Sequence, residues 1–128
     1  LAIGEKADYE NAQNALLEER FDDSLILFER FLENYPDSPL SASVIIAKGN
    51  AYEGLGEIKK AARAYLNSFS LYEGSPVAPE ALTLLGNALV SLGQTDAGCQ
   101  TLAQVLMRFP DSDFSFEAEK MMSELQCP

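Results

Sequence analysis

A chain of 128 residues is one ordinary domain, long enough to bury a core without metals or many cross-links. Its net charge of −11 argues against nucleic acid as a partner, because phosphate binding needs clustered Lys and Arg, and the 9 basic residues are scattered among 20 acids. The absence of histidine removes the commonest general base and zinc ligand. We therefore expect no enzyme, metal or cofactor, and protein partners with basic surfaces.

No apolar run approaches the roughly 18 residues that a membrane-spanning helix needs, so direct membrane insertion is not expected. The chain opens at Leu1 rather than at Met, and we interpret it as a processed or trimmed fragment. Residues 1–6 carry no strong signal and are expected to form a leader or linker.

One short stretch occurs three times at a fixed spacing. Tyr35-Pro36-Asp37-Ser38 returns as Tyr72-Glu73-Gly74-Ser75 and as Phe109-Pro110-Asp111-Ser112, and the offsets agree, since 72 − 35 = 37 and 109 − 72 = 37. Self-similarity at about 20–50 residues marks a repeat array, and periods in the mid-thirties belong to paired helices. In each copy we expect the aromatic residue to pack the end of one helix, the proline or glycine to stop it, and the serine to cap the next.

Apolar periodicity and helix signals between these stretches predict three helix pairs and a seventh helix. The helices are expected at about residues 7–19, 22–35, 39–55, 58–71, 79–92, 96–109 and 113–127. Ser38, Thr95 and Ser112 are the expected N-caps, and Gly56 and Gly93 are expected to end the helices before them. The resulting domain covers residues 7–128, with repeats at about 7–38, 39–75 and 76–112 and a capping helix at about 113–127.

Superposing the repeats at the 37-residue step shows columns of small, small, large and proline-type residues. These columns are Ala12, Gly49 and Gly86; Ser24, Ala61 and Gly98; Phe28, Tyr65 and Leu102; Pro36, Glu73 and Pro110. Small residues let paired helices approach closely, and the large residue fills the gap beside the crossing. This is the tetratricopeptide pattern, so we predict an all-α, right-handed superhelix of tetratricopeptide type.

Particular strings carry a closer resemblance. The segments 28–40, 61–66, 91–96, 99–102 and 108–110 are together similar to the C-terminal domain of the YbgF/CpoB family of the Tol-Pal system. The resemblance implies a periplasmic, non-enzymatic adaptor that contacts TolA and helps to coordinate peptidoglycan synthesis with outer-membrane constriction during cell division. It also implies an intact protein that oligomerises through an N-terminal coiled coil absent from this chain. The alternative is another envelope scaffold whose concave groove binds peptide segments.

Two cysteines are expected to meet. In a tetratricopeptide stack the end of the capping helix lies antiparallel to the start of the third repeat's second helix, which places Cys127 beside Cys99. An oxidising periplasm permits a disulfide that fastens the cap to the array. The alternative is a buried Cys99 and a free Cys127.

A column of carboxamides is the main candidate for binding. Gln13, Asn50 and Asn87 are expected to project from the first helix of each repeat into the concave groove, where amides suit a peptide backbone. Their expected groove neighbours are Tyr9, Leu16, Ile46, Glu53, Thr83 and Val90. The alternatives are solvated amides on a polar face and ordinary packing between helices.

Overall fold

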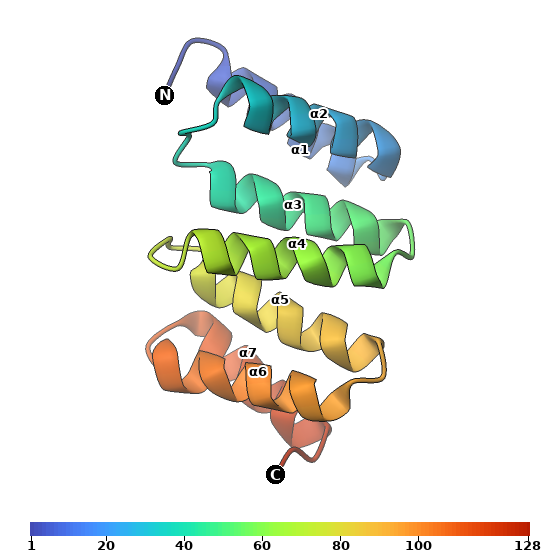
Figure 1. Ribbon diagram of the computed structural model, residues 1–128, viewed down its shortest axis with the longest axis vertical. Helices are drawn as coiled ribbons and strands as arrows, with labels where there is room; N and C mark the ends of the chain where they lie inside the picture. Colours follow the sequence, from blue (N-terminus) through green and yellow to red (C-terminus); the bar gives the residue numbers. More distant parts are fainter.

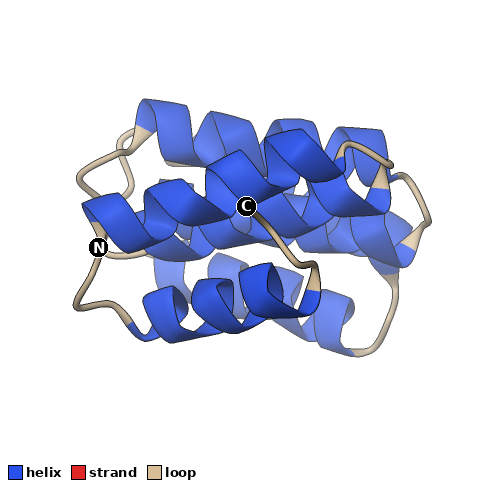
Figure 2. Cartoon of the chain, turned by 90° about the horizontal axis from the view of Figure 1, so that it is seen from below, coloured by secondary structure: helices blue, strands red, loops and turns tan.

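The computed structural model describes residues 1–128, which form seven helices and no strand (Figures 1 and 2). The helices are α1 (Glu5–Leu17), α2 (Phe21–Asn34), α3 (Ser41–Gly54), α4 (Ile58–Leu71), α5 (Ala78–Ser91), α6 (Thr95–Arg108) and α7 (Asp113–Glu124). They stack in chain order along the long axis, with the two termini at opposite ends (Figure 1). This is the all-α tetratricopeptide-type repeat fold that the sequence predicts. None of the helices has the length and apolar character needed to cross a membrane.

The second helix of each pair follows the sequence repeat closely. Helices α2, α4 and α6 begin at Phe21, Ile58 and Thr95, and the steps are 58 − 21 = 37 and 95 − 58 = 37. Each ends directly before the aromatic residue of the recurring stretch, which has φ of −131° at Tyr35 and −132° at Phe109. The aromatic therefore leaves the helical conformation, so α2 and α6 end one residue before the predicted ends at 35 and 109, and the turn that follows leads into the next repeat.

The starts of the other helices agree with the predictions only in part. Ser112 is the N-cap of α7, and its hydroxyl accepts a hydrogen bond from the Phe114 amide at 3.1 Å. The Ser38 hydroxyl instead accepts from the Leu40 amide at 3.0 Å, and α3 begins only at Ser41. The prediction of Ser38 as a helix N-cap is therefore wrong, because the serine stabilises a separate turn before the helix.

Two further helix starts differ from their predicted positions by one or two residues. Thr95 is the first residue of α6 rather than its N-cap, and Gln94, the actual N-cap, makes no side-chain capping bond. Helix α1 begins at Glu5, after Gly4 with φ of 82°, so the last two of the residues expected to precede the first helix belong to it.

The small and large columns pack as expected from their sizes. Phe28, Tyr65 and Leu102 are all 0% exposed. A Cβ atom added at Gly86 would lie 2.8 Å from Leu102 side-chain atoms, so a larger residue here would force the buried leucine to shift. The same relation holds between Gly49 and the Tyr65 ring. The buried apolar residues form two clusters, a smaller one shared by α1, α2 and α3 and the main one that runs from α3 to α7.

Helix α7 covers the end of this core. Its Ala118 is 0% exposed within the main cluster, and Phe114 and Met122 pack against that cluster. The outward side of α7 is expected to be polar for a terminal helix, but Phe116 is 73% exposed there. The expectation of a wholly polar outer face is therefore wrong at this residue.

Candidate binding surface

The array curves toward the side formed by the first helices of the repeats. Helix α1 contacts α3 and α5 contacts α7, in addition to the contacts between neighbours in the chain. No pair of second helices makes a comparable contact. We call the side formed by α1, α3, α5 and α7 the first-helix face. Because α1 meets α3 and α5 meets α7 on this side, although α3 and α5 make no comparable contact, first helices approach one another at both ends of the array. This is the side on which the sequence places the binding groove.

The three carboxamides of the predicted column have different surroundings. Gln13 donates a hydrogen bond to the Tyr9 hydroxyl at 2.6 Å within α1. Asn50 accepts one from the Tyr65 hydroxyl at 2.8 Å, and Tyr65 is fully buried. Asn87 is exposed and makes no side-chain hydrogen bond. Only Asn87 therefore has both its donors and its acceptor free for a ligand, whereas Asn50 anchors a core tyrosine.

Two of the expected groove neighbours lie in the interior. Ile46 is 3% exposed and belongs to the main core cluster. Thr83 is 2% exposed, and its hydroxyl donates to the Pro79 carbonyl at 2.8 Å within α5. Their placement on the groove surface is corrected, because α3 and α5 bury these side chains against the helices that neighbour them in the chain.

The other apolar residues expected beside the carboxamides, Tyr9, Leu16 and Val90, are partly buried by neighbouring helices and partly exposed to solvent. The Tyr9 ring meets the Phe31 ring edge-on, with the ring centroids 6.0 Å apart. Leu16 packs against the N-terminal hydrophobic cluster to which Phe31 belongs. Val90 is half-buried beside Gly98, where an added Cβ atom would meet its side chain. These three contribute mainly to contacts between helices and present only part of their surface.

The same face holds carboxylates that are partly removed from water. Burial raises the pKa of Glu53, an effect that the nearby Tyr65 hydroxyl partly opposes. Burial also raises the pKa of Glu80, and repulsion from Glu117 adds to the shift. Glu80 lies two helical turns before Asn87 on α5, and Glu117 lies on α7. Half-buried carboxylates without a cation favour a ligand that supplies one.

Tyr65 connects this face to the core. Burial raises the pKa of its phenol, with the Glu53 charge as a further cause. The tyrosine therefore remains neutral and donates its hydroxyl hydrogen at neutral pH. The large residue of the repeat column thus both fills the helix crossing and positions Asn50.

Cys99 and Cys127 form a disulfide bond that joins α6 to the residues after α7, with the Cα atoms 5.6 Å apart. No free cysteine is present. The bond closes at the antiparallel ends that the repeat geometry brings together, and it fixes the C-terminal residues against the array.

Sequence reasoning did not identify Glu80 and Glu117, nor a basic groove on the other side of the molecule. The two glutamates are separated by the repeat step, since 117 − 80 = 37, which is the signal that could have paired them. For the groove, the available signal was the group of Lys59, Lys60 and Arg63 on one predicted helix.

Comparison with known proteins bears on the third repeat. The family model described as tetratricopeptide repeat matches residues 80–112, which include most of α5 and all of α6. No curated protein matches the chain. Tetratricopeptide repeats are typically non-catalytic modules that bind proteins on the extended surface of the array, and the match supports a protein-interaction domain here.

Proposed function

We propose that this chain is the protein-binding domain of a periplasmic adaptor of the Tol-Pal type, which helps to coordinate peptidoglycan synthesis with outer-membrane constriction during cell division. The observation that carries the binding role is the tetratricopeptide repeat at residues 80–112 within an array of the same architecture. The Tol-Pal assignment rests on the resemblance of the strings within residues 28–110 to the YbgF/CpoB family, and TolA is the partner that it implies.

The disulfide supports the proposed compartment. Disulfides persist in oxidising environments such as the bacterial periplasm and are rare in reducing ones. The bond between Cys99 and Cys127 joins α6 to the residues that follow α7, so it is suited to a structural role in an exported protein.

The first-helix face is the proposed binding surface. Asn87 offers a free carboxamide, and Glu53 and Glu80 offer carboxylates whose desolvation is compensated when a cation approaches. A segment with a Lys or Arg side chain and exposed backbone amides fits this arrangement. The strongly acidic character of the whole chain also favours the approach of such a segment.

Calorimetric titration of this domain with the periplasmic part of TolA tests the proposal. We expect binding that weakens in Asn87→Ala, while Asn34→Ala, another exposed carboxamide at the end of α2, leaves it unchanged. Both variants should keep the wild-type melting temperature, because neither side chain makes a hydrogen bond. Equal loss of affinity in both variants would exclude the first-helix face as the binding surface.

A second candidate is another envelope scaffold that holds a peptide from a different protein in the same face. The exposed carboxamide of Asn87 supports it, because an amide binds any peptide backbone without regard to the partner's identity. Failure of TolA to bind either this domain or the intact, coiled-coil-bearing protein would favour this candidate over the Tol-Pal role.

A further inference from the structure

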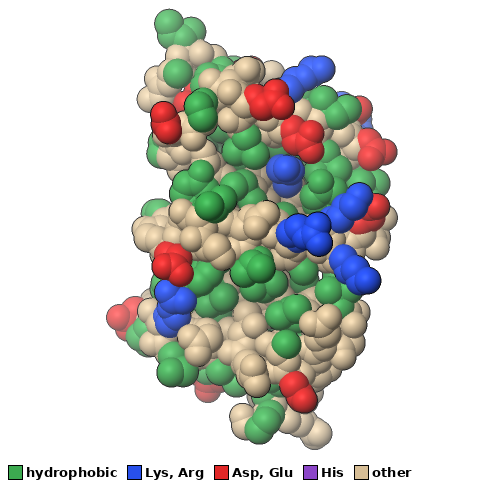
Figure 3. Space-filling view, in the orientation of Figure 1, with side chains coloured by type: hydrophobic (Ala, Val, Ile, Leu, Met, Phe, Trp, Pro, Cys, Tyr) green, Lys and Arg blue, Asp and Glu red, His purple; other side chains and the backbone are tan.

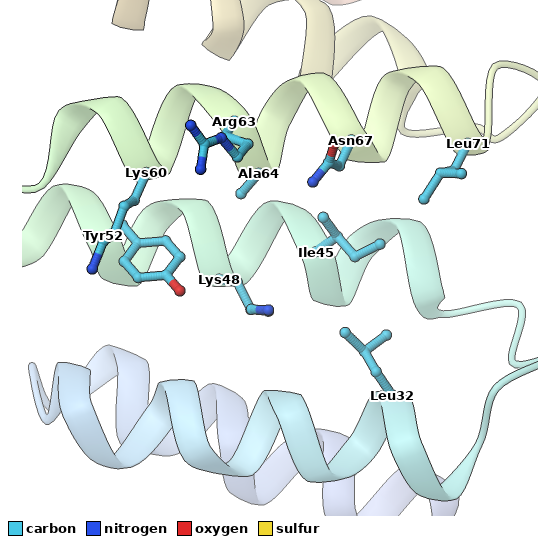
Figure 4. Close-up of a pocket in the computed structure, with 9 residues that line it drawn as sticks. All are labelled: Leu32, Ile45, Lys48, Tyr52, Lys60, Arg63, Ala64, Asn67 and Leu71. Carbon is cyan, nitrogen blue, oxygen red and sulfur yellow. The ribbon is translucent and has the colours of Figure 1, made fainter.

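A groove of about 370 Å³ lies on the side opposite the first-helix face, between α2 and α4, with α3 as its floor (Figure 4). We call it the α2–α4 groove. Its lining residues come from these three consecutive helices, and Ile45, Lys48 and Tyr52 are those of α3. It shares no lining residue with the predicted carboxamide groove.

One end of the α2–α4 groove is basic. Lys48 of α3 and Lys60 and Arg63 of α4 line it, and no Asp or Glu is among the lining residues. These are three of only 9 basic residues in a chain with 20 acids. Figure 3 shows Lys and Arg side chains gathered over α3 and α4, whereas acidic side chains lie over α2. The groove is therefore a local exception to the charge of the molecule.

These cations are incompletely neutralised by the protein itself. Lys48 pairs with Glu29 at 3.8 Å and Lys60 with Glu57 at 3.4 Å, and all four side chains reach solvent. Arg63 is exposed and has no ion-pair partner. Exposed pairs of this kind contribute little to stability, so exchanging their carboxylates for those of a ligand has a small cost.

The other end of the groove is apolar. Leu32 of α2, Ile45 of α3 and Leu71 of α4 converge there, as Figure 4 shows. Leu71 is 68% exposed, whereas Tyr65 and Phe69 of the same helix are buried. An apolar side chain of a partner that packed against Leu71 would remove this exposed surface from water.

We infer that the α2–α4 groove binds an acidic and apolar peptide segment of a partner protein, with its carboxylates toward Lys48, Lys60 and Arg63 and its apolar side chains toward Leu32, Ile45 and Leu71. The basic and apolar ends are complementary to such a segment in charge and in hydrophobicity. A bare polyanion fits less well, because it leaves the apolar end uncovered. The surface is separate from the first-helix face, so the domain holds two segments of opposite charge on opposite sides.

The test uses a labelled synthetic peptide with an acidic half followed by a leucine-rich half, titrated into the protein by fluorescence anisotropy. The control peptide carries Asn and Gln in place of the acids. We expect saturable binding of the first peptide, and chemical-shift changes of backbone amides confined to α3, α4 and the end of α2. Absence of binding, or shifts on the first-helix face, would overturn the inference.

Matched variants separate the groove from general electrostatics. Arg63→Glu reverses a lining charge, whereas Lys59→Glu makes the same change in net charge on the same helix outside the groove. We expect Arg63→Glu to weaken binding by about tenfold or more, because a like charge then faces the peptide, while Lys59→Glu changes it little. Leu71→Ser should weaken binding more than Leu66→Ser, which alters another exposed leucine of α4. Equal effects within each pair would contradict a specific site.

Two other ligands of the α2–α4 groove, a polyanion and a second copy of this chain, would give results that differ from those expected for the peptide. Phosphatidylglycerol vesicles or single-stranded DNA that bind as well as the peptide, and lose binding in Arg63→Glu, would identify a polyanion site and overturn the proposal. Self-association in analytical ultracentrifugation that is lost in Arg63→Glu would identify a second copy of this chain as the occupant, with the same consequence. Asn87→Ala should leave peptide binding unchanged, so the outcome is independent of the TolA experiment.

Discussion

Glu19 has the left-handed backbone conformation at the end of α1, with φ of 61°. The equivalent residues of the next repeats are Gly56 and Gly93, with φ of 77° and 82°. At all three positions the chain reverses with the same hydrogen-bond pattern, in which the next amide bonds a carbonyl five residues back, as Arg20 does to Ala15 at 2.9 Å. The first repeat therefore has strain that the others avoid through glycine.

Glu19→Gly should stabilise the domain by about 0.5–1 kcal/mol, since the relief of left-handed strain exceeds the added entropy of glycine in the unfolded chain. The measurement is urea unfolding followed by circular dichroism. Gly56→Ala is the reciprocal control: a Cβ atom at Gly56 meets nothing within 4 Å, so any loss of stability reports backbone conformation alone. A destabilised Glu19→Gly protein would contradict this interpretation.

Asn50→Ala should destabilise the domain by about 1–3 kcal/mol, because it leaves the buried Tyr65 hydroxyl without the acceptor at 2.8 Å. Asn87→Ala should change stability by less than about 0.5 kcal/mol, since its side chain is exposed. Thermal unfolding of both variants measures the difference. Tyr65→Phe should remove most of the effect of Asn50→Ala, and additive losses in the double variant would show that the two side chains are not coupled.

At the level of helices, the repeat length carries most of the information. The second helices begin at a constant step of 37 residues because the aromatic residues after them and the left-handed residues before them (Glu19, Gly56 and Gly93) recur at that step. The first helices are harder to place. A serine followed by proline is compatible with a helix N-cap and with a turn, and the choice at Ser38 depends on how the next helix packs.

The candidate site is harder to predict from the sequence than the helices are. Helical spacing places Ile46 and Thr83 beside the carboxamides, but their burial depends on how α3 and α5 pack against neighbouring helices, which no single helix reveals. The same is true of the α2–α4 groove, because its lining comes from three different helices. Cysteine pairing was easier to foresee, since antiparallel helix ends alone bring the two residues together.

The disulfide should decide how firmly α7 is held. Helix α7 contacts only α5 and α6, and the bond closes a loop over a sequence separation of 28 residues. In the chain-entropy model a loop of this length contributes about 3–4 kcal/mol, so the double variant Cys99→Ser/Cys127→Ser should lose that amount in urea unfolding. Hydrogen exchange should increase first in α7.

Adding a reductant to the wild-type protein should reproduce the loss, and the same reductant should leave the double serine variant unchanged. Unchanged stability of the wild-type protein after confirmed reduction of the bond would show that packing of Ala118 and its neighbours suffices to hold α7.

At the scale of the whole molecule, the distribution of charge matters more than its total. The first-helix face holds half-buried carboxylates, and the α2–α4 groove on the other side holds the main group of cations. A domain with these two faces binds two segments without competition between them. Such a domain is suited to connecting proteins, which is the role proposed for it.

The raised pKa values of Glu53 and Glu80 predict a pH dependence of stability. A raised pKa in the folded state means that folding favours the protonated acid, so the stabilisation is full below the ordinary pKa of 4.5 and is lost as the pH rises through the folded-state values. The melting temperature should therefore increase as the pH falls from 7 toward 5. In Glu53→Gln/Glu80→Gln it should be higher than in the wild type at pH 7, and the difference should vanish near pH 4.5.

The control must remove two negative charges from glutamates that are exposed to water. Such a control is needed because protonation at low pH also reduces the repulsion among all the acidic residues of the chain. Glu33→Gln/Glu124→Gln does so at two exposed positions that make no ion pair. Differential scanning calorimetry of the three proteins across this pH range separates the two causes. If both double variants raise the melting temperature equally, general repulsion accounts for the pH dependence. A larger gain in Glu53→Gln/Glu80→Gln assigns it to the first-helix face, where a bound cation should then have the same stabilising effect as the proton.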